Sequence, residues 1–353
     1  NRPTRESLLS QPQPITLVGA QPSPYTRKMI ALMRYRRIPY AITWGDPATV
    51  LSEMGIAKPK VGLLPTFVLP DDAGQLHAVC DSTPIIRRLE AEYKGRSVIP
   101  ADPVMAFIDY LLEDFADEWV TKYMFHYRWH PQPDIENAGT LLPLFQKINL
   151  SQEQLAQFKA YVTERQVGRL HVVGSNEVTA PVIDASYKRL LSAMEAHLTE
   201  QPFLMGQRPG ASDFALYGQL TQLVGFDPTS RAIAHKISPR TVGYTGLLED
   251  QTGLEPKVTD WTNTDDMPET LKDILKEVGR VYVPALLANA KALQAGAKEW
   301  QTEIDGSLWT QQTFNYQGKC LQWINAEYQA LGEDHRTRID RLLAGTGCEH
   351  III

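Results

Sequence analysis

The chain has 353 residues, a net charge of -6 and a sequence pI of about 5.8. Hydrophobic residues make up 43% of it and charged residues 22%, as is ordinary for soluble globular proteins. The acidic balance argues against nucleic-acid binding, which needs clustered positive charge. No apolar run approaches the roughly 20 residues that cross a bilayer, so we expect no membrane partner either.

The first residues, 1–13, are polar and predict a loose N-terminal arm without the apolar core of a signal peptide. The three cysteines, Cys80, Cys320 and Cys348, are far apart and form no C-x-x-C pair. Neither a zinc site nor a dithiol site is therefore indicated, and we expect no metal. A reducing cytoplasm is the location that fits this cysteine usage best.

Residues 14–97 predict one small domain with the element order β-α-β-α-β-β-α. A Gly/Pro-rich stretch after residue 44 is expected to hold a short helix and loops. A cap residue and a first-turn proline open the last helix of this domain. The expected strands are 15–19, 40–44, 66–69 and 76–80, and the expected longer helices are 24–37 and 81–93.

The character of the chain changes at residues 98–103, which we take as a domain boundary. Residues 104–249 are expected to be all helical, with helices at 104–128, 151–171, 181–199 and 211–224. Residues 250–353 predict an extension with helices at 268–296, 317–331 and 333–344. Near 300–310, the pair Asp305-Gly306 between alternating residues is a strong hairpin signal.

Four segments together resemble the glutathione S-transferase superfamily over about residues 14–245. They are PSPYTRK at 22–28, LLPTFVL at 63–69, CDSTPIIRRLE at 80–90 and PFLMGQRPGASDFALYGQL at 202–220. The resemblance implies a thioredoxin-like N-terminal domain followed by an all-helical domain. It has no counterpart for residues 250–353, which are rich enough in aromatic residues to form a packed unit. This extension is expected to wrap the helical domain and cover the pocket; the alternative is that it alters the dimer surface.

The resemblance implies that glutathione is held as a co-substrate and that its thiol is ionised. A free thiol has a pKa of about 8.5, which a hydrogen-bond donor and a helix N-terminus both lower. Ser23 stands at the mouth of the 24–37 helix, where redox relatives carry cysteine, and is the expected donor to the sulfur. The alternative is that Ser23 is only an N-cap before Pro24. Tyr25 and Thr26 are rival donors.

The resemblance also implies the residues that hold the rest of glutathione. Leu64-Pro65 is expected to be a cis peptide bond, with the backbone of Leu64 gripping the cysteinyl part; the alternative is an ordinary trans proline. Lys58 or Lys60 would meet the glycyl carboxylate, although two loop lysines are more often simply solvated.

Asp81 and Ser82 are expected to bind the γ-glutamyl end, the acid meeting its ammonium and the hydroxyl its carboxylate. The alternative is again a helix cap. Many family members have Glu at the position of Asp81. The chain also has Gly210 where the family usually has a hydroxyl cap for the buried helix that carries Asp213, a motif we interpret as structural.

A pocket for the second substrate is expected between the domains, facing Ser23. The helix at 107–130 would form its wall, although an aromatic stripe at helical spacing is more often core. His126 and His130 lie four apart but lack a third ligand, so we expect no metal there. The expected pocket residues are Tyr25, Trp119, Tyr123 and Tyr127.

The resemblance thus predicts a serine-type glutathione transferase that adds the glutathione thiolate to a small hydrophobic electrophile. The alternative is a non-catalytic relative that serves binding or scaffolding, which the long extension and the changes at Asp81 and Gly210 favour. A thiol reductase is disfavoured because the first turn holds no cysteine. A two-fold homodimer is the expected assembly.

Overall fold

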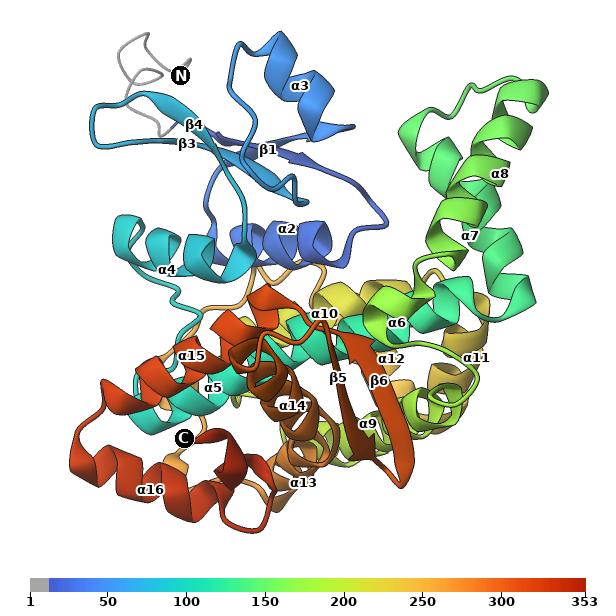
Figure 1. Ribbon diagram of the computed structural model, residues 1–353. Coiled ribbons are helices and arrows are strands. Elements are labelled where there is room, and N and C mark those ends of the chain that lie inside the picture. Colours follow the sequence, from blue (N-terminus) through green and yellow to red (C-terminus); the bar gives the residue numbers. More distant parts are fainter. Residues whose placement is uncertain (1–12) are drawn as a thin grey trace, which may run out of the picture.

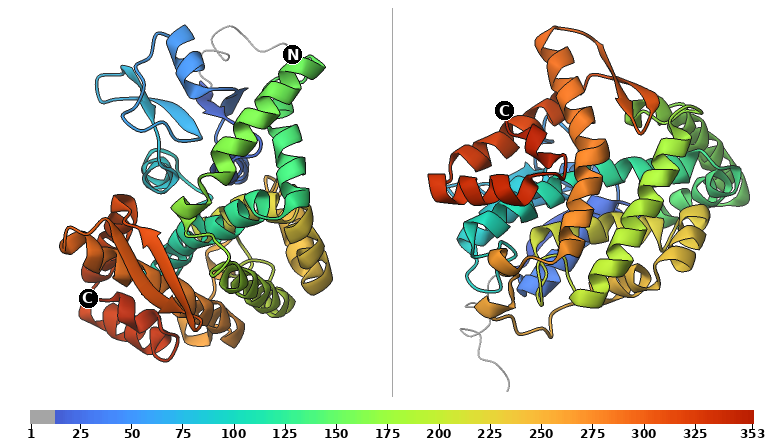
Figure 2. Two further views of the ribbon diagram at one scale, coloured as in Figure 1. Left: turned by 45° about the vertical axis from the view of Figure 1, so that its right-hand side comes forward. Right: turned by 90° about the horizontal axis from the view of Figure 1, so that it is seen from below.

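The computed structural model describes residues 13–353 (Figure 1). The predicted N-terminal arm, residues 1–13, lies outside this range except for its last residue. A sheet domain sits on one side of a layer of helices, and the C-terminal part of the chain packs on that layer from another side (Figures 1 and 2). Within the described range, no helix is both long and apolar enough to span a bilayer.

The N-terminal domain is a four-stranded sheet with helices, and its predicted element order is confirmed. Strand β1 is parallel to β2 and antiparallel to β3, which in turn pairs with β4, giving the order β2-β1-β3-β4. This arrangement is thioredoxin-like. The elements are β1 Ile15–Gly19, α2 Pro24–Arg36, β2 Tyr40–Trp44, α3 Pro47–Glu53, β3 Thr66–Pro70, β4 Leu76–Val79 and α4 Ser82–Glu92.

The second domain is all helical, as predicted, but it contains three helices that the sequence did not reveal. These are α7, α11 and α12, each with a proline in its first turn. The helices α11 and α12 are short and so carry little periodicity, and α7 contains Pro143, a residue that usually signals the end of a helix. The helices are α5 Pro103–Phe115, η1 Ala116–Val120, α6 Thr121–Trp129, α7 Gln132–Gln146, α8 Gln152–Val167, η2 Leu170–Val173, α9 Ala180–Glu200, α10 Ala211–Leu223, α11 Pro228–Ile237 and α12 Pro239–Leu247.

The extension is a packed unit of helices and one hairpin. The hairpin turn is the predicted one, with positive φ at both Asp305 (51°) and Gly306 (73°). Trp309 is fully buried against Trp119 of η1, with 5.2 Å between ring centroids. The elements are η3 Val258–Asp260, η4 Thr264–Asp266, α13 Glu269–Glu277, η5 Val278–Tyr282, α14 Val283–Gln294, β5 Glu299–Ile304, β6 Ser307–Gln312, α15 Asn315–Gln329, α16 Glu333–Leu343 and η6 Cys348–Ile351.

The two domains meet where α2 lies on α10. Both helices are almost completely buried along this contact. A Cβ atom at Gly218 of α10 would lie 2.3 Å from the carbonyl oxygen of Pro24 and 3.0 Å from Cβ of Lys28. Only glycine allows this close approach, because a backbone oxygen cannot move aside as a flexible side chain can.

Gly218→Ala should therefore destabilise the protein by about 1–3 kcal/mol, the range for overpacking a close contact. Chemical denaturation measures this. The matched control is Gly243→Ala in α12, where nothing lies within 4 Å of the added Cβ. That variant should gain up to about 1 kcal/mol from helix propensity. Equal effects of the two substitutions would contradict the close contact.

Asp114 connects α5 to the extension. The hydroxyl of Tyr282 in η5 donates a hydrogen bond to the Asp114 carboxylate. The ring of Phe115 packs against that of Tyr282, with 6.0 Å between ring centroids. Burial raises the pKa of Asp114 to about 7. The folded protein therefore holds this proton more tightly than the unfolded chain does.

The stabilisation from a protonated Asp114 is complete below the unfolded pKa near 3.8 and is lost as pH rises through about 7. This group should lower the free energy of unfolding by up to about 1.4 kcal/mol per pH unit in that window. Asp114→Asn cannot ionise, so its stability should fall less between pH 5 and 8 than that of the wild type. Urea unfolding at several pH values checks this, and parallel curves for the two proteins would refute it.

Candidate functional site

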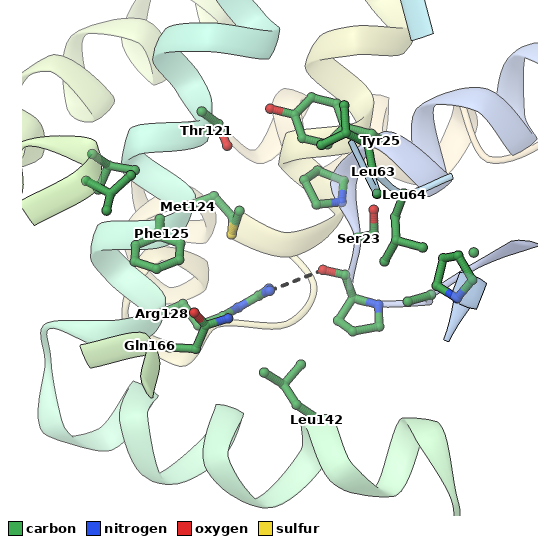
Figure 3. Close-up of a pocket in the computed structure, with 18 of the residues that line it drawn as sticks. Ser23, Tyr25, Leu63, Leu64, Thr121, Met124, Phe125, Arg128, Leu142 and Gln166 are labelled. Carbon is green, nitrogen blue, oxygen red and sulfur yellow. Dashed lines mark hydrogen bonds between the residues drawn. The ribbon is translucent and has the colours of Figure 1, made fainter. Parts of the chain in front are cut away.

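A large cavity opens between the N-terminal domain, the helical domain and the extension. Its volume is about 1120 Å³, and Figure 3 shows some of the side chains that line it. The turn between β1 and α2, residues 20–23, forms one wall, and the helix formed by η1 and α6 lies opposite it. The arms of α7 and α8 add apolar side chains, among them Leu142, Phe145 and Phe158.

Ser23 lies on the cavity wall and is the N-cap of α2. Its Oγ accepts a hydrogen bond from the backbone N–H of Thr26 at 3.2 Å. The predicted cap therefore exists, but it does not exclude the other role. A hydroxyl that accepts one bond still has its own proton to donate. The sulfur of a bound thiolate would accept a hydrogen bond from this hydroxyl, beside the positive end of α2.

The two rival hydroxyls are differently placed. Tyr25 lines the cavity, but its hydroxyl already donates to the backbone oxygen of Asp117 at 2.6 Å. Burial raises the pKa of Tyr25 well above its ordinary value. Thr26 is fully buried, and its Oγ1 accepts from the N–H of Ala20. Among the three hydroxyls of this turn, Ser23 is thus the best placed donor toward the cavity.

The helical domain fixes the turn that carries Ser23. Arg128 of α6 donates to the backbone oxygen of Pro22 at 3.2 Å (Figure 3). The same guanidinium binds both carboxylate oxygens of Asp227 and the side-chain oxygen of Gln222. Such a bidentate pair holds Arg128 in one orientation. The position of Ser23 therefore depends on contacts from the second domain.

The segment before β3 forms a further part of the wall. Leu63 and Leu64 line the cavity, and the Leu64-Pro65 bond is cis, as expected. Pro65 itself is buried. Lys58 and Lys60 are exposed and lie outside the cavity wall, so their position gives no support to the predicted contact with a glycyl carboxylate.

Asp81 and Ser82 lie on the same cavity, between β4 and α4. Asp81 has a φ of 83°, uncommon for a residue other than glycine, and its side chain makes no cap hydrogen bond. Its carboxylate instead accepts a bond from the hydroxyl of Tyr316 at 2.9 Å. Burial raises the pKa of Asp81. The extension therefore takes part in holding this acid.

Lys28 is a buried cation between the two domains, and the sequence analysis missed it. It is 0% exposed, and its Nζ donates to Ser82 Oγ at 2.9 Å, Glu113 at 2.9 Å and Asp117 at 2.7 Å. Burial alone would lower the pKa of Lys28, but the two carboxylates raise it. Arg87 completes the charge balance by pairing with Glu113 at 2.6 Å.

These contacts set different charge states for the two acids. Burial would raise the pKa of Glu113, but Arg87 and Lys28 lower it to about 2, so Glu113 is ionised at neutral pH. Burial raises the pKa of Asp117 to about 6. One oxygen of Asp117 binds Lys28, and the other is buried without a partner among the described residues.

The η1 segment is a π-helical turn in the middle of the long helix predicted at 104–128. It turns Asp117 and Glu118 onto the cavity wall, followed by Thr121, Lys122 and Phe125 of α6. Such turns are frequent at functional sites. The periodicity of a single sequence predicts an ordinary helix here, so these acids were not identified as site residues.

The structure does not place Trp119, Tyr123 and Tyr127, which were expected to line the pocket, on this cavity. Their stripe faces α9 and is buried, and none of the three borders the cavity. The Tyr123 hydroxyl lies 2.6 Å from Oγ of Ser186, and the Tyr127 hydroxyl donates to Asp184 at 2.7 Å. The cavity is bordered instead by another face of the same helix, which carries Thr121, Lys122 and Phe125. Of the predicted pocket residues, Tyr25 alone borders it.

The other motifs of the helical domain are structural. Asp213 accepts from the backbone N–H of Gly210 at 2.9 Å and from Leu204 at 2.7 Å, which fixes the start of α10. His126 stacks on His130 with 4.6 Å between ring centroids, and its ring nitrogen bonds Ser175. Across residues 13–353, no group of His, Cys, Asp and Glu side chains has the arrangement to hold a metal ion.

The extension closes the cavity from a third side. Its hairpin contributes Gln311, and the start of α15 contributes a run from Phe314 to Gln317 and then Lys319. Gln317 donates to Glu118 at 3.1 Å, beside the bond between Tyr316 and Asp81. The extension is therefore a structural part of this site.

Comparison with known proteins supports the assignment that this geometry suggests. The family model described as glutathione S-transferase, N-terminal domain, matches residues 17–97, and the model described as glutathione S-transferase, C-terminal domain, matches residues 153–249. Together they cover about half of the chain. A search of curated proteins found no significant match.

The solved structures that match the chain are distant in sequence. A glutathione S-transferase of Ceriporiopsis subvermispora in complex with glutathione is 21% identical, with a TM-score of 0.42, covering 68% of this chain and 99% of that chain. A Tau class enzyme from mango, Mangifera indica, is 16% identical, with a TM-score of 0.39 and coverages of 74% and 96%. One from Rhodospirillum rubrum is 16% identical, with a TM-score of 0.41 and coverages of 67% and 88%.

Both domain matches follow the order of the domains in the chain, and the sheet and helical domains have the expected architecture. The chain belongs to the glutathione S-transferase superfamily.

Proposed function

We propose that the protein is a serine-type glutathione transferase, with glutathione as co-substrate and a small electrophile as second substrate. The observation that carries the proposal is the position of Ser23, whose hydroxyl caps α2 at the wall of the cavity and keeps a proton to donate. A hydrogen bond and a helix N-terminus both favour the anionic form of a thiol.

In this proposal, the glutathione sulfur lies beside Ser23 and the peptide extends along the N-terminal domain. The backbone of Leu64 pairs with the cysteinyl part. Asp81 binds the γ-glutamyl ammonium, and the hydroxyl of Ser82, oriented by Lys28, binds the adjacent carboxylate. The thiolate then attacks an electrophile held by the apolar wall that includes Met124 and Phe125.

A second candidate is a non-catalytic member of the superfamily that binds its ligand without activating it. The extension favours it, because residues from Phe314 to Gln317 form part of the cavity wall and the minimal family fold has no such segment. The pKa of the bound thiol distinguishes the two functions. A homodimer and a cytoplasmic location remain predictions, and sedimentation and localisation test them.

Ser23→Ala should raise the pKa of the bound glutathione thiol by about 1–2, because a hydrogen bond to a charged group contributes about 1.5–3 kcal/mol. Titration of the ultraviolet absorbance of the thiolate in the complex measures this. Transfer to the electrophile should slow by about 100-fold or more, the range for one lost oxyanion donor.

Loss of the cap itself needs a control, because Ser23→Ala also removes about 1 kcal/mol of helix stabilisation. Ser238→Ala removes a comparable cap, since the Ser238 side chain accepts from the N–H of Thr241 at the start of α12 and does not border the cavity. It should leave the thiol pKa unchanged. A bound thiol with its ordinary pKa in the wild type would instead favour the non-catalytic candidate.

Tyr316→Phe removes the hydroxyl that holds Asp81, which should weaken glutathione binding by about two- to tenfold, the effect of one hydrogen bond. The thiol pKa should stay unchanged, because the sulfur lies at the other end of the peptide. Calorimetric titration with glutathione measures the affinity. The matched control is Tyr328→Phe, which removes a similar bond to Asp340, 2.8 Å long, within the extension. Equal affinities of all three proteins would remove Tyr316 from the site.

A further inference from the structure

Lys122 is a buried cation on the wall of the cavity. Its side chain is 2% exposed, yet it borders the space that the electrophile would occupy. Burying an ammonium group is costly unless an anion pairs with it. Within the described part of the chain, no carboxylate lies close enough to Lys122 to form an ion pair, in contrast to Lys28 with its two acids.

The partners that Lys122 does have are neutral. Its Nζ donates to the side-chain oxygen of Gln311 at 3.0 Å and to the backbone oxygen of Val173 at 3.4 Å. It also lies 5.6 Å from the ring centroid of Trp119 and 5.8 Å from that of Trp309. Carbonyl dipoles and ring faces stabilise a cation but supply no net charge. An ammonium has three N–H donors, so one is left for a ligand.

The acid nearest along the helix does not neutralise Lys122. Glu118 lies one turn before it and accepts a bond from Gln317. Burial raises the pKa of Glu118 to about 8, so at neutral pH this group mostly holds its proton. Burial lowers the pKa of Lys122 to about 8, which leaves it mostly charged at pH 7. The wall thus carries a positive charge without a counter-ion.

We propose that Lys122 forms an anion-binding subsite for the second substrate, so that the electrophile carries a carboxylate or similar acidic group next to an apolar part. The apolar part would lie against the side chains of α6 and α7 that border the same cavity, among them Phe125 and Leu142. This assignment names a substrate class and rests on the proposed function.

A matched pair of probes tests the subsite without any reaction. 2-Naphthoate and 2-naphthamide have nearly the same shape, and only the first is an anion. In calorimetric titrations without glutathione, the wild type should bind 2-naphthoate at least about tenfold more tightly, as expected for a bond between charged groups. Lys122→Met and Lys122→Gln should lose this preference and keep their affinity for 2-naphthamide. The control Lys319→Met, which alters an exposed cation on the same wall, should keep the preference.

Thermal unfolding separates this role from a purely structural one. If Lys122 serves only to fasten the hairpin through Gln311, its removal should lower the melting temperature. If Lys122 serves to bind an anionic ligand, Lys122→Met should have a melting temperature no lower than that of the wild type. The reason is that the substitution removes a buried charge that has no counter-ion in the ligand-free protein.

The proposal is overturned if the wild type binds the two probes equally or binds neither, or if both Lys122 variants keep the preference. Retention on immobilised glutathione is measured alongside. A protein that shows the preference for 2-naphthoate but does not bind glutathione would contradict the proposed function and leave the anion subsite standing.

Discussion

The site depends on one buried ammonium group. Lys28 reaches from the first helix of the sheet domain to two acids of the helical domain and also holds the hydroxyl of Ser82. Removing any member of such a buried network leaves a charge without compensation, at a cost of about 3–5 kcal/mol. The contact therefore fixes the two domains against each other beside the cavity that they both line. Gly218 makes the accompanying approach of α10 to α2 possible.

The sequence was sufficient for the parts of the fold that rest on local patterns. Strands, the hairpin at Asp305-Gly306 and the serine cap at α2 all follow from periodicity and turn chemistry. The resemblance then supplied the thioredoxin-like class of the first domain and the cis bond at Leu64-Pro65, which no local pattern fixes.

What the sequence could not predict depends on which face of a helix meets which neighbour. The aromatic stripe that begins at Trp119 was assigned to the pocket, but it packs on α9, and the π-helical turn η1 shifts the register of the residues after it. Neither a π-helical turn nor a long-range partner such as Tyr316 for Asp81 produces a recognisable pattern in a single sequence. Lys28 and Lys122 are indistinguishable in the sequence. They differ in the folded protein, where Lys28 is paired with acids and Lys122 has neutral partners.

The contact between Tyr316 and Asp81 joins residues 235 positions apart. During synthesis, domains generally fold from the N-terminus onward as the chain emerges. The sheet domain, with Ser23 and Ser82, is complete long before the ribosome has made residue 316. The cavity therefore gains its third wall only after residue 316 has been made, so a product that terminates earlier lacks the hydroxyl that holds Asp81.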